Sequence, residues 1–274
     1  MNFARADLDR LCAIIAEAAA AEIMPRFRSL ESGGVREKTS ALDVVTDADE
    51  KAEWRMRDAI AKAFPEAAFV GEESVARDPS LLDKIAGADL AIIIDPVDGT
   101  SNFAWGLPLF GVLGAVTVKG ETVAGIIYDP LSHDWRLALR GTGAWALASN
   151  GTARDLKVAR PGSAASMTGI ASWYMAPEPL RSRIAANLPK VKAAFAYRCA
   201  AYEYRLICDG HLHFALHYKL MPWDHAAGVL IHAEAGGYCA RFDASPYAPS
   251  QTTGGLLLAP DKVSWQALHA ALLT

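Results

Sequence analysis

The stretch Asp95-Pro-Val-Asp-Gly-Thr-Ser-Asn-Phe103 guides the interpretation of this chain, because it joins an apolar run to a polar turn. Residues 90–94 before it read Leu-Ala-Ile-Ile-Ile, which is typical of a buried strand. Such a strand carries two carboxylates to the edge of a sheet, and the Gly-Thr-Ser-Asn turn that follows is able to begin a helix. Carboxylate oxygens suit a hard cation such as Mg²⁺, and backbone N–H groups at a helix start suit a phosphate. The stretch therefore predicts a metal-assisted phosphoryl-transfer site.

The composition is that of an ordinary globular protein. The chain has 274 residues, 52% hydrophobic and 21% charged, which is enough to bury a core. The net charge of −4 gives no basic surface for nucleic acid, and no apolar run approaches the ~18 residues of a membrane span, so we expect neither partner. The first ten residues lack the pattern of a secretory signal, and the four cysteines lack metal-type spacing. We therefore expect reduced thiols and a cytoplasmic protein.

Hydrophobic periodicity and turn residues predict a mixed α/β (α+β) chain. Helices are predicted at residues 7–24, 47–64, 177–187, 200–208, 224–235 and 261–272. Strands are predicted at residues 68–70, 90–94, 112–118, 123–128, 135–139, 168–172, 212–216 and 256–258. The first part is rich in hairpins and the second mixes helices with strands, so we expect two lobes, residues 1–145 and residues 146–274. The glycine-rich turns at residues 140–155 would join them.

Acidic residues recur at the ends of the predicted elements, in four separate segments. These are residues 43–49, the pair Glu72-Glu73, the pair Asp95 and Asp98, and residues 223–228. Taken singly, an Asp at a helix start is a cap, and two glutamates after a strand form a solvated turn. Asp95 resists this interpretation, because an acid that closes an Ile-rich strand is costly to bury unless it is paired or metal-bound. A calcium loop is excluded, since Asp95 and Asp98 do not alternate and no glutamate closes a twelve-residue loop.

The same segments carry four motifs of a known family. They read Asp-x-Val-Thr-x-x-Asp at 43–49, Gly-Glu-Glu-Ser at 71–74, Asp-Pro-x-Asp-Gly-Thr-x-Asn-Phe at 95–103, and Trp-Asp-x-Ala-Ala-Gly at 223–228, with Glu-Ala-Gly-Gly at 234–237. In this order the motifs resemble the inositol monophosphatase family, which also includes histidinol-phosphate, adenosine bisphosphate and archaeal-type fructose bisphosphate phosphatases. The resemblance implies the sugar-phosphatase fold, a layered α-β-α-β-α sandwich of two lobes, and a homodimer.

The resemblance also implies a metal site between the lobes, with two or three Mg²⁺ ions. Glu72, Asp95 and the main-chain carbonyl of Val97 would hold the first ion. Asp95, Asp98 and Asp224 would hold the second, and Glu72 would help to place a weaker third ion through water. The ions would neutralise the charge of the phosphate and lower the pKa of water, so that no covalent phospho-enzyme is required.

The catalytic residues that the family implies are Asp49, Thr100 and Glu72. The Thr100 hydroxyl accepts a proton from water only if its own hydrogen points elsewhere, and Asp49 is the natural acceptor. The N–H groups of Gly99 and Thr100, together with Asp98, would bind the substrate's phosphate group. The accessory residues are Lys38 and Glu73.

The match to the family weakens in the second lobe, where the leaving group of the substrate should bind. The family's acidic residue seven positions before Asp224 is replaced by His217, and the strand aspartate four positions earlier is replaced by His213. Residues 198–201 read Arg-Cys-Ala-Ala in place of the usual Gly-Ser. These departures disfavour inositol phosphate as the substrate.

The histidines of this segment have more than one interpretation. His211 and His213 are either half-buried strand residues or part of an accessory metal site. We expect His217 to face the substrate and Lys219 to contact an anionic leaving group. Glu203, on the preceding helix, is expected to be a structural or interface residue.

The sequence therefore predicts Mg²⁺-dependent hydrolysis of a small phosphorylated metabolite, an inositol-phosphate-like, sugar or polyol phosphate. Histidinol phosphate, fructose bisphosphate and nucleotide 3′-phosphates stay open as substrates. An alternative of another class is a metal-binding regulatory protein without turnover. That alternative is disfavoured by the complete set of Asp49, Glu72, Asp95, Asp98, Thr100 and Asp224.

Overall fold

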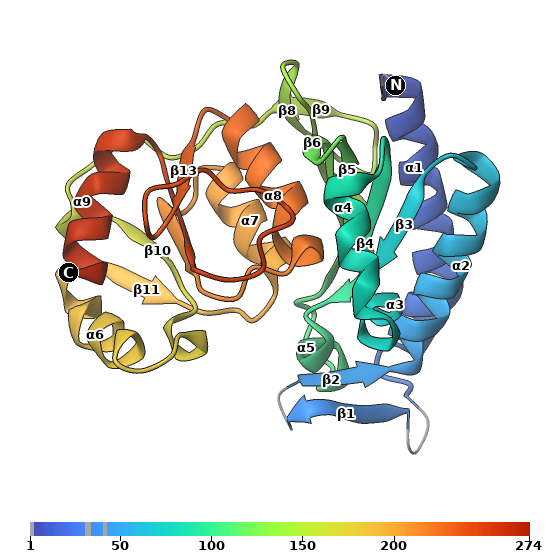
Figure 1. Cartoon of the computed structure of the whole chain (residues 1–274), viewed down its shortest axis with the longest axis horizontal. Coiled ribbons are helices and arrows are strands. Elements are labelled where there is room, and N and C mark those ends of the chain that lie inside the picture. Colours follow the sequence, from blue (N-terminus) through green and yellow to red (C-terminus); the bar gives the residue numbers. More distant parts are fainter. Residues whose placement is uncertain (1–2, 31–33, 41–42) are drawn as a thin grey trace.

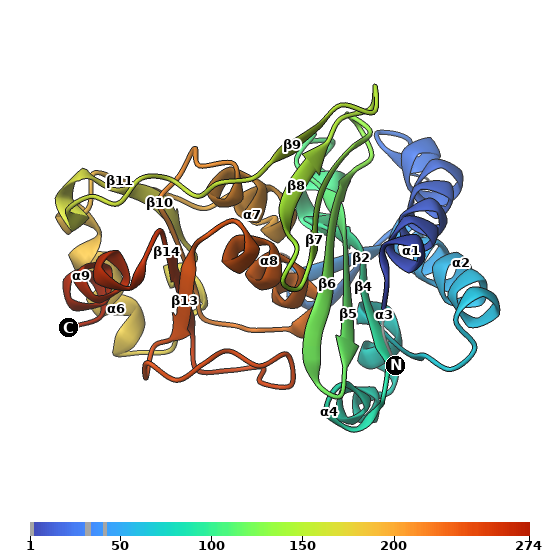
Figure 2. The ribbon, with the colours of Figure 1, turned by 90° about the horizontal axis from the view of Figure 1, so that it is seen from above.

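The computed structural model describes residues 3–30, 34–40 and 43–274. Its elements form five layers, in which two sheets alternate with three layers of helices, as Figure 1 and Figure 2 show from two directions. The helical layers, from right to left in Figure 2, are α1 (Arg5–Ala18) with α2 (Asp47–Ala63), then α7 (Ala200–Cys208) with α8 (Pro222–Glu234), then α6 (Leu180–Asn187) with α9 (Lys262–Leu273). The predicted α-β-α-β-α sandwich is confirmed.

A seven-stranded sheet forms the second layer, in the order β3-β4-β5-β6-β7-β8-β9. Its strands are β3 (Ala68–Gly71), β4 (Ala91–Asp98), β5 (Gly111–Val118), β6 (Glu121–Asp129), β7 (Asp134–Leu139), β8 (Gly143–Leu147) and β9 (Ala153–Asp155). β3 and β4 are parallel and the later pairs are antiparallel. β4 is buried along its whole length: Ile92 and Ile94 pack toward α1 and α2, and Ile93 packs toward α8. Because helices cover both faces, residues 91–94 of the strand are continuously apolar rather than alternating.

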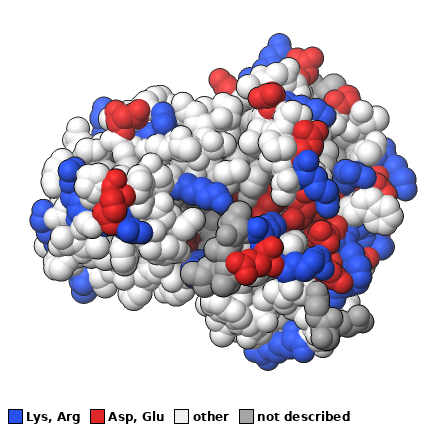
Figure 3. All heavy atoms as spheres, turned by 60° about the horizontal axis from the view of Figure 1, so that its bottom comes forward, with Lys and Arg blue, Asp and Glu red and all other residues white. Residues whose placement is uncertain are grey.

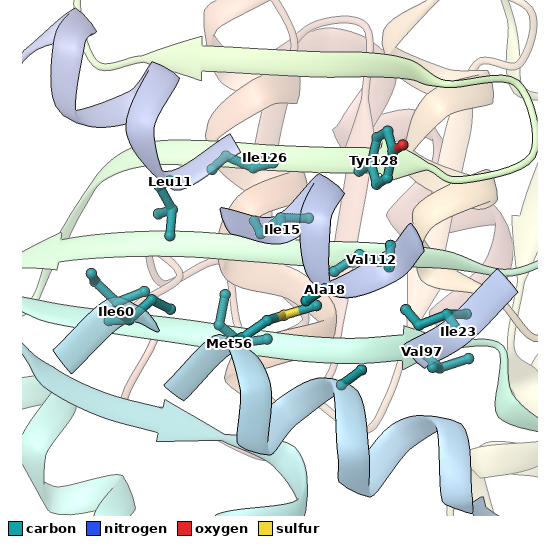
Figure 4. Packing of buried hydrophobic residues seen from close by; sticks show 14 of the residues in the cluster. Leu11, Ile15, Ala18, Ile23, Met56, Ile60, Val97, Val112, Ile126 and Tyr128 are labelled. Carbon is teal, nitrogen blue, oxygen red and sulfur yellow. The ribbon is translucent and has the colours of Figure 1, made fainter. Parts of the chain in front are cut away.

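Figure 4 shows the core between the first helices and this sheet. Leu11 and Ile15 of α1, and Met56 and Ile60 of α2, pack in one cluster with strand residues such as Ile126. All five side chains are at most 1% exposed. Their spacing of four residues along each helix is the periodicity that predicted the two helices.

A five-stranded sheet forms the fourth layer, in the order β11-β10-β12-β14-β13. Its strands are β10 (Thr168–Ala171), β11 (Ala193–Phe195), β12 (Phe214–His217), β13 (Tyr238–Arg241) and β14 (Leu256–Ala259). Leu216 and Leu257 pack in a cluster with Leu268 of α9, whereas Leu258 packs in a cluster with Tyr204 of α7. The two faces of this sheet are therefore both covered by helices.

Every predicted helix and strand has a counterpart, with shifted boundaries. The helix predicted at 177–187 begins only at Leu180, because Pro177 and Pro179 precede it and proline disfavours helical geometry in the residue before it. The strand predicted at 212–216 begins at Phe214, because the N–H groups of His211 and Leu212 both donate to the carbonyl oxygen of Leu206. The division into two lobes near residue 145 stays a prediction.

Several short elements lack a clear signal in the sequence. They are the hairpin of β1 (Val35–Ser40) and β2 (Asp43–Thr46), the helices α3 (Glu72–Arg77), α4 (Asp83–Gly87) and α5 (Thr100–Ala104), the strands β8, β9, β11 and β13, and single turns of helix at residues 79–82, 164–166, 173–175 and 188–190. Of these only α5 was anticipated, from its polar turn. The helix predicted at 7–24 is α1 followed by a π-helical turn at Ala19–Ile23 and a 3₁₀ turn at Met24–Arg26. In the described residues no helix combines the length and the apolar character needed to cross a membrane. The described cysteines are all free thiols, as expected.

Candidate active site

The C-terminal end of β4 carries Asp95 and Asp98. In a regular strand, residues three apart point to opposite faces of the sheet. The pairing of β4 with β5 shifts register between these two residues, and Pro96 between them has no N–H for a ladder. Val97 N instead donates a hydrogen bond of 3.0 Å to Asp95 Oδ1. The irregularity explains how both carboxylates reach one cluster.

The third member of the cluster is Asp224, in the first turn of α8. Pro222 opens this helix, where its missing N–H costs nothing. α8 packs on β4, β5 and β6, so its first turn reaches the end of β4. Asp95, Asp98 and Asp224 each offer one carboxylate oxygen, and these oxygens all lie within 4.8 Å of one another. The structure thus joins the acids that the sequence placed at separate element ends.

The charges of this acidic cluster are costly without a counter-ion. Burial raises the pKa of Asp98 to about 6, and raises the pKa of Asp95 and of Asp224 well above the usual range. Repulsion from Glu72, and among the carboxylates of the cluster, raises the pKa values of Asp95 and Asp224 further. A hard divalent cation prefers oxygen ligands and would offset the repulsion. The donor set therefore fits Mg²⁺.

Lys38 connects the β1–β2 hairpin to two more acids. Its Nζ lies 2.9 Å from Glu72 Oε1 and 2.6 Å from Glu73 Oε1. Burial alone would lower the pKa of Lys38, but the two carboxylates raise it. Burial, and then repulsion from Glu72, raises the pKa of Glu73 to about 8. Lys38 thus stays charged and holds Glu72 beside the acidic cluster.

Glu53 of α2 is a buried acid that the sequence did not single out. Its Oε2 accepts a hydrogen bond of 2.6 Å from Glu73 N, and its Oε1 accepts one of 2.6 Å from the Ser74 hydroxyl. A Cβ atom on Gly71 would lie 2.3 Å from this carboxylate, so a larger residue there would displace the Glu53 side chain. Glu53 therefore fixes the start of α3, and with it the direction of Glu72. The Gly-Glu-Glu-Ser motif was the available signal, but it did not point to α2.

Thr100 and Asp49 form a hydrogen-bonded pair. Thr46 is the N-cap of α2, and both its N–H, at 2.9 Å, and its hydroxyl donate to Asp49 Oδ2. Asp49 Oδ1 lies 3.0 Å from Thr100 Oγ1, which also lies 2.9 Å from the carbonyl oxygen of Val97. The hydroxyl has one hydrogen, so donating it to either oxygen leaves its lone pairs to accept a proton. Burial raises the pKa of Asp49 to about 7.

A cavity of about 420 Å³ opens beside these residues. We call its first part the acid half, formed by Glu72, Asp98, Thr100 and Asp224. We call its second part the second-sheet half, which includes Ser172, Tyr174, Glu203, His217 and Lys219. Figure 3 shows acidic and basic side chains gathered beside the junction between the two halves of the molecule. Asp49 and Asp95 lie directly beneath the cavity surface, at 0% and 2% exposure, and we count them with the acid half.

The second-sheet half contains a buried, largely neutral group of polar side chains. His217 is 5% exposed, and its Nδ1 lies 3.8 Å from Glu203 Oε2. Burial lowers the pKa of His217 and raises the pKa of Glu203 to about 8. Tyr204 stacks on His217 with ring centroids 5.9 Å apart. Lys219 is exposed at the rim of the cavity.

The predicted substrate residues are therefore near the acids, but their roles stay predictions. Glu203, expected to be a structural or interface residue, also lines the cavity, and its Oε1 accepts a hydrogen bond of 2.9 Å from Tyr197 N. His211 is exposed, and His213 Nδ1 lies 3.3 Å from Thr168 N. In the described part of the chain, neither histidine belongs to a cluster of three metal-binding side chains. Both histidines precede β12, so they do not alternate along one face of a strand as predicted.

The family model of the inositol monophosphatases matches residues 7–274. The chain belongs to the inositol monophosphatase family. The family's phosphatase fold, and with it the class of phosphoric monoester hydrolases, is thereby assigned to this chain. The acidic cluster and the Asp49–Thr100 pair lie within the matched region.

Individual relatives are similar to this chain over most of its length, and their names differ in the role they state. The protein named Nus factor SuhB of Haemophilus influenzae is 32% identical over 231 residues, which cover 83% of this chain and 82% of that protein. The fructose-1,6-bisphosphatase/inositol-1-monophosphatase of Thermotoga maritima is 30% identical over 213 residues, covering 76% and 75%. The crystal structure of the extragenic suppressor protein suhB from Bartonella henselae superimposes with a TM-score of 0.80 at 25% identity, covering 97% of this chain and 98% of that one.

Proposed function

We propose that this protein hydrolyses the phosphate monoester of a small sugar, polyol or related metabolite with the help of Mg²⁺. The observation that carries the proposal is the acidic cluster, whose three carboxylate oxygens lie within 4.8 Å of one another beside a cavity. Such a concentration of buried negative charge is stable with a divalent cation and is costly without one.

The proposed ligands are Glu72, Asp95, Asp98, Asp224 and the carbonyl oxygen of Val97. They would hold two or three Mg²⁺ ions, which when bound would neutralise the phosphate charge and lower the pKa of the attacking water. The chain itself supplies the geometry: the register shift in β4 turns Asp95 and Asp98 to one place, and α8 adds Asp224. Lys38 would balance the charge of Glu72 at the edge of the site.

Thr100 and Asp49 are proposed to position the attacking water and to take its proton. Thr100 Oγ1 would accept a proton from the water while its own hydrogen passes to Asp49 Oδ1, 3.0 Å away. The two hydrogen bonds from Thr46 hold the other oxygen of Asp49 and fix the direction of the transfer. Backbone N–H groups of Gly99 and Thr100 would contact the phosphate.

The leaving group is proposed to lie in the second-sheet half. A neutral His217 replaces the acid that this family commonly has there, so the recognition of neighbouring hydroxyl groups should differ from that of an inositol phosphatase. Lys219, exposed at the rim, would favour a leaving group with a second anionic group. Fructose bisphosphate, nucleotide 3′-phosphates, histidinol phosphate and inositol phosphate are therefore the substrates to compare.

The test is phosphate release from a panel of these esters, measured with purified protein in EDTA and at increasing Mg²⁺. We expect release that requires Mg²⁺ and differs between the esters. No metal-dependent release from any of them would overturn the proposal and favour a non-catalytic metal-binding protein. A cytoplasmic location and a homodimer stay predictions, the second open to light scattering.

A further inference from the structure

Asp98 is held from the start of α7. Its Oδ2 accepts a hydrogen bond of 2.5 Å from Ala201 N and lies 3.0 Å from Cys199 Sγ, whose thiol is a donor. Both donors lie at residues 199–201, where α7 begins, whereas Asp98 ends β4. The middle helical layer and the first sheet therefore meet at a carboxylate of the acidic cluster.

Cys199 fits closely into this meeting point. It is 2% exposed and lines the cavity. Gly99, with φ of 85°, turns the chain directly after Asp98, and a Cβ atom there would lie 3.2 Å from Cys199 Sγ and 2.8 Å from the Leu109 carbonyl oxygen. The thiol therefore occupies the space between the carboxylate and the Gly99 turn.

α7 is in turn fixed against the first sheet. The Tyr202 hydroxyl donates a hydrogen bond of 2.8 Å to Asp129 Oδ2 at the end of β6. Arg205, one turn further along the helix, pairs with Asp134 at the start of β7. Because two side chains of α7 are anchored on neighbouring strands, the N–H and thiol at its start have a defined position relative to Asp98.

We propose that Cys199 is a positioning residue for the metal site: its thiol, together with Ala201 N–H, fixes the Asp98 carboxylate in the orientation that binds a divalent cation. The inference rests on the proposed function, since it concerns the same cluster. Donors behind a metal-binding carboxylate restrict its rotation, so that less ordering is needed when the ion binds. A hydroxyl is a stronger donor than a thiol, so a serine at position 199 should also be able to hold the Asp98 carboxylate.

The experiment measures the dissociation constant for Mn²⁺ from the EPR signal of the free ion, with the purified full chain and no substrate. Cys199→Ala removes both the donor and volume, Cys199→Val removes the donor and keeps much of the volume, and Cys199→Ser keeps a donor. We expect the dissociation constant to rise about tenfold in the Ala and Val variants. The Ser variant should bind Mn²⁺ close to wild-type affinity.

Cys208→Ala is the matched control. Cys208 is a fully buried cysteine on the same helix, in the hydrophobic cluster behind the cavity. Its truncation should lower the melting temperature, because it leaves space in the core, without changing Mn²⁺ affinity. Melting curves of all four variants separate a loss of folding from a loss of metal affinity.

Two results would overturn the inference. One is wild-type Mn²⁺ affinity in both Cys199→Ala and Cys199→Val; the other is a loss in Cys199→Ser as large as in those two. A wild-type protein that binds no Mn²⁺ would instead remove the metal site of the proposed function. The ratio of the variants' dissociation constants to that of the wild type thus tests the role of Cys199. Binding of Mn²⁺ by the wild type tests whether the metal site exists.

Discussion

The acid half and the second-sheet half of the cavity are built in different ways. The acid half gathers carboxylates that other elements hold in place: Asp98 accepts a hydrogen bond from Ala201 N of α7, and Glu72 pairs with Lys38 of the β1–β2 hairpin. In the second-sheet half, by contrast, Glu203 and His217 come from α7 and β12 and are buried close to neutrality. The acid half therefore concentrates charge that a cation would offset, whereas the second-sheet half presents largely neutral groups to the proposed leaving group.

The largest expected effect lies in the acid half. Asp95→Asn removes a charge proposed to be shared by two cations, and we expect kcat to fall by about 1,000-fold or more. Phosphate release at saturating Mg²⁺ measures this. Asp83→Asn, on the exposed surface of α4, is the control and should keep the wild-type rate. A near-normal kcat for Asp95→Asn would show that the acid half does not carry the reaction.

Thr100→Ala should be the next largest effect. It removes the hydroxyl 3.0 Å from Asp49 Oδ1, so we expect kcat to fall about 100-fold with little change in KM. Thr100→Ser keeps the hydroxyl and should restore much of the rate. If KM instead rose about 100-fold and kcat did not change, Thr100 would be assigned to binding of the substrate's ground state.

Metal-free stability should fall as the pH rises from 6.5 to 8. The pKa of Asp49 is raised to about 7, and those of Glu73 and Glu203 to about 8, so in this range the folded chain binds protons that the unfolded chain has already lost. The free energy of unfolding then decreases with pH. Buried histidines with lowered pKa values, such as His225, oppose this trend near and below pH 6.5, where the unfolded chain binds protons that the folded chain does not.

Mg²⁺ should restore the stability that is lost at high pH through the carboxylates beside the proposed metal site. At 100 times its dissociation constant, an ion that binds only the folded state adds about 2.7 kcal/mol. We expect melting temperatures in EDTA to be lower at pH 8 than at pH 6.5, and Mg²⁺ to raise them more at pH 8. Equal Mg²⁺ effects at both pH values would contradict the raised carboxylate pKa values.

The smallest effect should come from the second-sheet half. His217→Glu restores the acid common at this place in the family, and we expect the ratio of kcat/KM for inositol 1-phosphate over fructose bisphosphate to rise about tenfold. His211→Glu places the same charge at an exposed position and is the control. An unchanged ratio would remove His217 from the substrate site.

The sequence predicts an element where burial leaves a periodic pattern of apolar residues. The apolar run at 90–94 and the four-residue spacing of Leu11 and Ile15 predicted β4 and α1, because their periodicity reflects burial. The β1–β2 hairpin was missed, since strand residues such as Arg36 and Lys38 are polar and pair outside both main sheets. Glu53 could not be foreseen either, because a glutamate on a helix is ordinarily solvated and only the tertiary fold buries it.

A crystal structure with Mn²⁺, located by its anomalous scattering, tests the proposed metal site most directly. We expect at least one ion bound by Asp95, Asp98 and Asp224, with oxygen ligands at about 2.1 Å as for Mg²⁺. Mn²⁺ at other positions only, with these three carboxylates unbound at saturating metal, would contradict this expectation.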